Sequence, residues 1–315
     1  MRNLPDQTLH NGMALNHFVT QIEGKLMKTR YSLQDRIVVI SGGGRGIGLA
    51  TATAFRNAGA KVAIGDIDTA LAEQAAASIG GFGGYLDVRS QQSFIDFIKA
   101  TEAALGAVDI LVNNAGIMPM GAMVEESAAI SDAQIDINLR GVIHGIKAVL
   151  PNMLARQSGH IVNVASLAGR FPIPGASVYC ATKFAVVGLT ASLRAELRET
   201  PIGVSVVMPS KVTTELSSGT GDNLPIPTVA PEDVAAAILT AVQDNLAEIA
   251  VPRYLTGLSS MYGMTPKWLD GRVRRFIGDN RILTNLDRKA RKGYEQRLDQ
   301  VAAKPIEGVH DRMQN

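Results

Sequence analysis

Tyr179 and Lys183 stand four residues apart in the run Tyr179-Cys-Ala-Thr-Lys183. In a helix this spacing places both side chains on the same face. A lone phenol has a pKa of about 10 and is almost wholly protonated at neutral pH. An ammonium group beside it in a partly desolvated pocket stabilises the phenolate, so the pair can serve as a general base and acid. Because the same spacing also occurs as a plain surface contact, its meaning depends on the elements around it.

A glycine-rich run, Ser41-Gly42-Gly43-Gly44-Arg45-Gly46-Ile47-Gly48, follows the short apolar segment 37–40. A turn whose backbone approaches a phosphate closely cannot carry Cβ atoms at several positions. A helical pattern follows at 47–58, and a helix N-terminus presents unpaired N–H groups and a positive dipole end. The place of the run between a strand and a helix, at the head of a β-α-β unit, predicts a site for the diphosphate of a dinucleotide.

Asp66 ends the second apolar run, Lys61-Val-Ala-Ile-Gly-Asp66, 18 residues after Gly48. An acidic side chain there can accept hydrogen bonds from both hydroxyls of an adenosine ribose, and it repels a 2′-phosphate. Arg45 favours the opposite cofactor, because a basic residue in the glycine turn can pair with that phosphate. We expect the repulsion to dominate, which predicts NAD as the cofactor and makes NADP the less favoured one.

Short apolar runs alternate with amphipathic stretches from about residue 34 onward. The strand-like runs lie at 37–40, 61–65, 108–112, 161–164, 204–208 and 248–251, and the longest helical patterns at about 128–155 and 177–200. Strands that are apolar on both faces and separated by helices indicate a parallel sheet covered on both sides. We predict a doubly wound α/β fold of the Rossmann type, with three α/β/α layers. Its single catalytic domain should span residues 34–252, between an N-terminal extension at 1–33 and a basic C-terminal extension at 253–315.

Taken together, these motifs resemble the short-chain dehydrogenase/reductase family. In the family's order and spacing, the chain carries the glycine run 41–48, Asp87-Val88 where the family's third strand ends, Asn113-Asn-Ala-Gly116 after the run 108–112, Asn138, Ser166 and the Tyr179-x-x-x-Lys183 pair. The resemblance covers residues 34–252, about seven-tenths of the chain. It implies an oxidoreductase that moves hydride between an alcohol carbon and a nicotinamide cofactor.

The resemblance assigns a role to each of four catalytic candidates. Tyr179 would be the general acid and base that takes the alcohol proton, and Ser166 would hydrogen-bond the same substrate oxygen. Lys183 would hold the nicotinamide ribose and lower the pKa of the tyrosine. Asn138 would anchor a water that links Lys183 to solvent as a proton relay.

The family also implies cofactor contacts along the carboxyl edge of the sheet. Asp87 and Val88 resemble the adenine contacts, and the Asn114-Ala115-Gly116 segment resembles the lining of the adenosine ribose. The expected cofactor-binding residues are Gly42, Arg45, Gly46, Ile47, Gly48, Asp66, Asp87, Val88, Asn114, Ala115, Gly116, Tyr179, Lys183, Pro209, Val212 and Thr214.

One departure from the family pattern follows the apolar run 204–208, where the chain reads Pro209-Ser210-Lys211-Val212-Thr213-Thr214. Val212 and Thr214 keep the positions that would bond the nicotinamide carboxamide. Ser210 replaces the usual glycine and cannot take a positive φ as freely. The departure therefore bears on the geometry of this loop, and we expect cofactor binding to survive it.

Methionines gather in loops expected at the carboxyl ends of the strands, at Met118, Met120, Met123 and Met208. Ligands of open α/β sheets bind at this edge, and a methionine-rich lining suits a lipophilic alcohol such as a steroid or retinoid. The same residues could simply pack the loops. Two other functions stay open: an NADPH-dependent reductase of carbonyls or 3-oxoacyl thioesters, and a non-catalytic dinucleotide-binding sensor or scaffold. Asp66 argues against the first, and the complete catalytic set argues against the second.

Composition narrows the partners. Among 315 residues, 31 Lys and Arg stand against 29 Asp and Glu, and a net charge of +2 does not suggest a nucleic-acid binder. A single cysteine, Cys180, and five scattered histidines predict no metal site. We find no signal-peptide pattern and no run apolar enough to span a bilayer, and so expect a cytoplasmic enzyme. The resemblance implies a homodimer or homotetramer paired through the two long helices.

The stretch 267–297 is strongly basic, with ten basic and four acidic residues. Three interpretations are open: a solvated helical face, a cover over a subunit or the active site, and an interfacial helix in peripheral contact with an anionic membrane. The cover would use an apolar stripe formed by Trp268, Leu269, Val273, Phe276 and Ile277.

Overall fold

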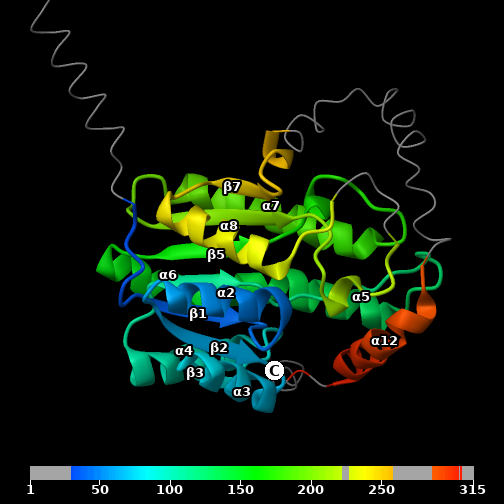
Figure 1. The fold of residues 1–315 in the computed structure, drawn as a ribbon, viewed down its shortest axis with the longest axis horizontal. Coiled ribbons are helices and arrows are strands. Elements are labelled where there is room, and N and C mark those ends of the chain that lie inside the picture. The colour runs from blue at the N-terminus through cyan, green and yellow to red at the C-terminus, as the bar shows by residue number, and fades with distance from the viewer. Residues whose placement is uncertain (1–29, 222–226, 258–285, 305, 307–315) are drawn as a thin grey trace, which may run out of the picture.

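The computed structural model of the chain describes residues 30–221, 227–257, 286–304 and 306. Its centre is a sheet of seven strands in the order β3-β2-β1-β4-β5-β6-β7 (Figure 1), and every neighbouring pair is parallel. The strands are β1 (Ile37–Ser41), β2 (Lys61–Asp66), β3 (Phe82–Tyr85), β4 (Ile110–Asn113), β5 (His160–Val164), β6 (Gly203–Pro209) and β7 (Glu248–Val251). The predicted doubly wound α/β fold is confirmed.

Helices cover both faces of the sheet. One face is packed by α2 (Gly46–Asn57), α3 (Thr69–Ile79) and α8 (Pro231–Gln243), whose apolar side chains form one core with the strands. The other face is packed by α4 (Gln91–Leu105), α6 (Gly141–Arg156) and α7 (Ser177–Glu196), which form a second core. The central strands need apolar residues at successive positions because both of their faces are buried.

The direction in which strands are added reverses between β1 and β4. Strands β2 and β3 lie on one side of β1, whereas β4 and β5 lie on the other. The loops after β1 and β4 therefore diverge at the carboxyl edge, which is where open α/β sheets bind ligands. The glycine turn follows β1 and Asn114 follows β4, so the fold brings both predicted motifs to this edge.

The long helix predicted around 128–155 is interrupted in the structure. Helix α5 (Ala128–Ile135) passes into a π-helical turn at Asp136–Arg140, which continues as α6. Turns of this kind shift the side chains that follow and occur frequently at functional sites. Asn138 lies in the turn and is fully buried. The turn therefore sets the direction of the Asn138 side chain, which a regular helix over this stretch would not have predicted.

A further helix, α12 (Arg288–Ala303), lies within the predicted C-terminal extension. It lies apart from the two helical layers (orange in Figure 1) and contacts α5. The apolar stripe at 268–277 that we considered as a cover lies outside the described residues. Within the described ranges, the structure has no helix long and apolar enough to cross a membrane.

Candidate active site

At the carboxyl end of β1, the glycine turn presents backbone that carries no Cβ atoms at several positions. Gly42 and Gly46 have φ values of +62° and +53°, a left-handed conformation that favours glycine. A Cβ on Gly42 would lie 2.8 Å from the Cα of Ala115, and one on Gly46 would lie 3.3 Å from Cγ2 of Thr214. No acidic side chain occupies the first turn of α2. Free backbone and an uncompensated helix N-terminus fit the diphosphate of a dinucleotide.

A cavity of about 810 Å³ runs along the carboxyl edge of the sheet from this turn. Its size suits a small-molecule site. All predicted site residues except Gly48 and Asn138 line it. Gly48 packs α2 against the turn, because a Cβ there would lie 2.7 Å from the Cα of Gly43.

Asp66 lies at the end of β2 and lines the cavity. Its Oδ2 accepts a hydrogen bond from the backbone N–H of Gly44 at 3.1 Å, so the carboxylate is fixed against the glycine turn. Arg45, the residue that would favour a 2′-phosphate, instead pairs with Glu215, with 2.9 Å between Nη1 and Oε2. The carboxylate and the guanidinium at this end of the cavity are therefore both held by protein partners.

A buried ion pair follows β3. Arg89 and Asp87 approach to 2.7 Å, and their side chains are only 3% and 5% exposed. Asp87, predicted to contact adenine, lines the cavity, but both of its carboxylate oxygens accept hydrogen bonds from Arg89. The sequence analysis did not single out Arg89, although a cation two residues after a buried acid is a recognisable pairing signal.

Asn114 joins the two loops that diverge at the sheet edge. Its Nδ2 donates to the carbonyl oxygens of Ser41 and Gly42, each at 3.0 Å. The Ser41 hydroxyl in turn accepts from the backbone N–H of Asn114 at 3.1 Å. These bonds fix the glycine turn against the end of β4, so Asn114 shapes the cavity as well as lining it.

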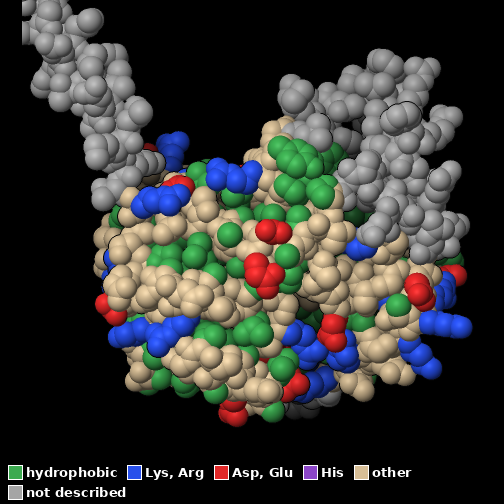
Figure 2. All heavy atoms as spheres, in the orientation of Figure 1, with side chains coloured by type: hydrophobic (Ala, Val, Ile, Leu, Met, Phe, Trp, Pro, Cys, Tyr) green, Lys and Arg blue, Asp and Glu red, His purple; other side chains and the backbone are tan. Residues whose placement is uncertain are grey.

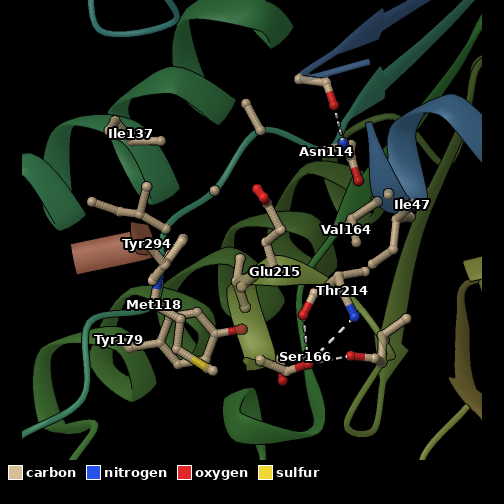
Figure 3. Close-up of a pocket in the computed structure, with 18 of the residues that line it drawn as sticks. Ile47, Asn114, Met118, Ile137, Val164, Ser166, Tyr179, Thr214, Glu215 and Tyr294 are labelled. Carbon is tan, nitrogen blue, oxygen red and sulfur yellow. Dashed lines mark hydrogen bonds between the residues drawn. The ribbon is translucent and has the colours of Figure 1, made fainter. Parts of the chain in front are cut away.

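Tyr179, Ser166 and Lys183 face one end of the cavity (Figure 3 shows the first two). Tyr179 is buried on α7, and burial raises its pKa, while a hydrogen bond with the Ser166 side chain lowers it. Lys183 donates to the carbonyl of Val164 at 3.0 Å, and burial lowers its pKa to about 8. The lysine is therefore still mostly cationic at neutral pH, and its Nζ lies 5.7 Å from the centroid of the Tyr179 ring.

Asn138 lies behind the same end of the cavity, next to Gly116, without lining the cavity itself. Its Oδ1 accepts from the N–H of Ile117 at 2.8 Å, and its Nδ2 donates to the Ile117 carbonyl at 2.9 Å and to Oγ1 of Thr182 at 3.2 Å. A Cβ on Gly116 would lie 3.2 Å from the Asn138 Oδ1 and 3.6 Å from the Lys183 Nζ. The space beside Gly116 is thus a point toward which both polar atoms converge.

The loop after β6 closes onto the glycine turn without glycine at position 210. Ser210 is not among the described residues with positive φ, so the serine fits the loop unstrained. Its N–H donates to the carbonyl of Val251 at 2.9 Å, and its hydroxyl donates to the carbonyl of Pro227 at 2.8 Å. Val212 and Thr214 line the cavity as expected.

Helix α12 supplies one wall of the cavity, and sequence reasoning did not assign it residue by residue. Tyr294, Arg297, Leu298 and Val301 line the cavity. The Tyr294 hydroxyl accepts a hydrogen bond from the N–H of Met118 at 2.8 Å, and burial raises the pKa of Tyr294 to about 12. The available signal was the four- and three-residue spacing of Tyr294, Leu298 and Val301, which puts them on one helical face.

Of the four methionines expected around the substrate, two line the cavity. Met118 and Met120 pack with Ile173 against a small cluster that includes Tyr179. Met123 is 58% exposed, and Met208 is fully buried in the core. Within the described ranges, no group of three or more His, Cys, Asp or Glu side chains is arranged to hold a metal ion.

A sequence model described as short chain dehydrogenase matches residues 36–224. The chain is 34% identical over 233 residues to an uncharacterized oxidoreductase of Staphylococcus saprophyticus, covering 70% of this chain and 97% of that protein. It is 36% identical over 237 residues to 2-(S)-hydroxypropyl-CoM dehydrogenase 3 of Xanthobacter autotrophicus, covering 68% and 92%.

A solved structure shares the architecture. It is a short chain dehydrogenase/reductase from Burkholderia phymatum in complex with NAD, with a TM-score of 0.66, 25% identity, and coverage of 73% of this chain and 94% of that one. The two relatives are named an oxidoreductase and a dehydrogenase, and this chain covers nearly all of the length of each. We conclude that the chain belongs to the short-chain dehydrogenase/reductase family and is an oxidoreductase that acts on CH–OH groups with NAD(P).

Proposed function

We propose that the protein is an NAD-dependent dehydrogenase that reversibly oxidises a lipophilic secondary or primary alcohol, with Tyr179 as general base and acid. The observation that carries the proposal is the convergence of Tyr179, Ser166 and Lys183 on one end of the cavity that begins at the glycine turn. A phenol, a hydroxyl and a cation at this place can hold an alcohol oxygen and receive its proton.

Two side chains, Tyr179 and Ser166, would act on the substrate oxygen. The Tyr179 phenolate takes the hydroxyl proton as the C–H bond of the alcohol breaks, and bound NAD supplies the hydride acceptor. The Ser166 hydroxyl donates a hydrogen bond to the same oxygen and stabilises its developing negative charge. Burial raises the pKa of Tyr179. Positive charges near the phenol must therefore lower this pKa again for the phenolate to form.

Lys183 supplies one such charge and a route for the proton. Its ammonium group beside the phenol favours the phenolate, and it would bind the nicotinamide ribose hydroxyls. The convergence of the Asn138 Oδ1 and the Lys183 Nζ beside Gly116 supports a relay in which Asn138 helps to anchor a water next to the lysine. The proton accepted by Tyr179 would leave along this path.

Two features support NAD over NADP. Asp66 places a carboxylate at the end of β2, where it can bind the ribose hydroxyls and repel a 2′-phosphate. Arg45 is paired with Glu215 and is therefore less able to offset that repulsion.

The lining near Tyr179 supports a lipophilic substrate. Met118, Met120 and Ile173 contribute thioether and aliphatic surface, and Leu216 and Tyr294 add to it. Burying such surface against an apolar substrate stabilises the complex, and methionine side chains adapt to substrates of varied shape. One relative is named for 2-(S)-hydroxypropyl-CoM, whose hydroxypropyl group carries a secondary hydroxyl, and this name supports an alcohol substrate without bearing on its lipophilicity.

The test is a cofactor and substrate screen. The purified protein is given NAD or NADP with steroids, retinoids and aliphatic alcohols, and reduced nicotinamide is followed by absorbance. We expect turnover with NAD on apolar alcohols and much weaker turnover with NADP. A preference for NADP would overturn the cofactor assignment, and a preference for small polar alcohols would overturn the substrate class.

A further inference from the structure

One face of α12 follows the cavity along its length. Tyr294, Leu298 and Val301 are spaced four and three residues apart, so they share a face, and all three line the cavity. At a rise of about 1.5 Å per residue, the face from Tyr294 to Val301 extends about 10 Å. Tyr294 bonds the loop after β4, whereas Val301 lies near the loop after β3. The helix therefore runs from the catalytic end of the cavity toward its adenosine end.

A buried arginine fixes the first half of α12. Arg291 is 0% exposed, and Nη1 donates to the carbonyl oxygens of Leu216 at 3.2 Å and Ser218 at 2.9 Å. Nη2 donates to the carbonyl of Met118, and the guanidinium lies 4.9 Å from the ring centroid of Tyr294. Because burying a cation is costly unless hydrogen bonds compensate, these bonds specify one docked position. Arg291 thus ties the helix to both loops at the catalytic end.

A second arginine fixes the other end. Arg89 Nη1 donates to the carbonyl oxygens of Val301 and Lys304, each at 2.9 Å, while the same guanidinium pairs with Asp87. These carbonyls are at the C-terminus of α12, where helix carbonyls lack partners and favour a cation. Leu298, only 4% exposed, lies between the two anchors. The adenosine end of the cavity is therefore bordered by α12 as well as by the loop after β3.

Between the anchors, three charged groups meet at the mouth of the glycine turn. The Oε2 atom of Glu215 is 2.9 Å from Arg45 Nη1 and 2.7 Å from Arg297 Nη2. All three side chains are 42–52% exposed, so water screens the cluster and it can rearrange at little cost. Its net charge is +1 and it lies beside the N-terminus of α2. In the space-filling view, basic and acidic side chains gather around a hollow beside α12 (Figure 2).

We propose that α12 is part of the dinucleotide-binding site, with Leu298 and Val301 closing the adenosine end and Arg297 binding the diphosphate. This inference rests on the dinucleotide site of the proposed function and adds a wall to it from the C-terminal extension. An incoming diphosphate carries two negative charges and competes with Glu215 for the two arginines. Arg297 then contributes a charge-assisted hydrogen bond from α12, in addition to the one that Arg45 can supply from the sheet edge.

The experiment measures binding, not turnover. ADP-ribose, which holds the adenosine and the diphosphate but no nicotinamide, is titrated by calorimetry into the full chain and into the Arg297→Gln and Lys292→Gln variants. Lys292 is an exposed residue of the same helix that does not line the cavity, so its variant is a control for the loss of one positive charge. We expect Arg297→Gln to weaken binding about fivefold at low salt, with a smaller gap at high salt, and Lys292→Gln to stay within about twofold.

The outcomes separate the two proposals. If the unaltered chain binds ADP-ribose and both variants bind it equally well, the role of Arg297 is wrong while the proposed function stands. If the unaltered chain binds neither ADP-ribose nor NAD, the proposed function itself fails. Hydrogen exchange gives a second readout: ADP-ribose should slow amide exchange in residues 288–303. Unchanged exchange there, or faster exchange from a displaced helix, would overturn the assignment of α12 to the site.

Discussion

The Nζ atom of Lys183 lies 5.7 Å from the centroid of the Tyr179 ring, and burial shifts the pKa values of the two groups in opposite directions. It lowers the pKa of the lysine to about 8 and raises that of the tyrosine. Low dielectric disfavours the charged form of each group, so the protein alone holds the pair closer to neutrality than water would. The proposed oxidation of an alcohol requires the charged phenolate, so we expect the positive charges of Lys183 and of the bound cofactor to favour it together.

The pH profile of alcohol oxidation should therefore depend on the lysine. With Lys183→Met the phenolate loses a neighbouring cation, so the pKa of Tyr179 rises further. The rise of kcat with pH should then move to higher pH by about one unit or more, with a lower rate at pH 7. The profile is measured at saturating NAD in both proteins. An unshifted profile would remove Lys183 from the activation of Tyr179.

The free energy of unfolding should also depend on pH through the protonation of Lys183. The pKa of Lys183 is about 8 in the folded protein against its ordinary value of 10.5, so the unfolded chain binds more protons between these values. The free energy of unfolding of the unaltered protein should therefore rise relative to that of Lys183→Met as pH increases from 8 toward 10.5. The full difference is up to about 3 kcal/mol. Urea unfolding of both proteins at pH 7, 8 and 10 measures it, and parallel curves would contradict the lowered pKa.

Gly116 should be intolerant of even one methyl group. A Cβ there would lie 3.2 Å from the Asn138 Oδ1 and would fill the space in which Lys183 and Asn138 converge. We expect Gly116→Ala to lower kcat at saturating NAD about tenfold, because the change acts on the proton path. Gly188→Ala, where a Cβ meets nothing within 4 Å, is the control. Equal activity of the two variants would argue against a relay at this point.

Cofactor preference should respond to the charge of Asp66. Asp66→Asn keeps an oxygen that can accept from the Gly44 N–H but removes the charge that repels a 2′-phosphate. The ratio of kcat/KM for NAD to that for NADP should fall about tenfold or more. Asp68→Asn, two residues on, removes the same charge from the cap of α3 and should leave the ratio nearly unchanged. If both variants change it alike, the effect is general electrostatics and not recognition at Asp66.

Most of the fold could be predicted because its signals are local. Buried parallel strands need apolar runs, and β1 and β7 begin where those runs begin. The third strand was harder, since Phe82–Tyr85 holds two glycines and remains partly exposed at the sheet edge. The π-helical turn around Asn138 was not predictable, because one extra residue in a helix leaves no clear trace in the pattern of apolar positions.

The wall formed by α12 shows where sequence reasoning stopped. Arg291 lies in a basic run that reads as a solvated face, yet it is fully buried, because carbonyls from two distant loops surround it. Such compensation depends on contacts between segments more than 70 residues apart, and charge counting cannot detect it. Asp87 was predicted from the family resemblance as an adenine contact, but its pairing with Arg89 was missed although their two-residue spacing offered a signal.

The central claim is that the Tyr179 hydroxyl handles the substrate proton, and Tyr179→Phe tests it most directly. The variant keeps the ring in its buried position and removes one oxygen. With an alcohol that the unaltered enzyme oxidises, kcat for the formation of reduced nicotinamide should fall about 10²–10⁴-fold, while the dissociation constant of NAD stays within about twofold. A variant that binds NAD normally and still oxidises the alcohol at near the original rate would contradict the account.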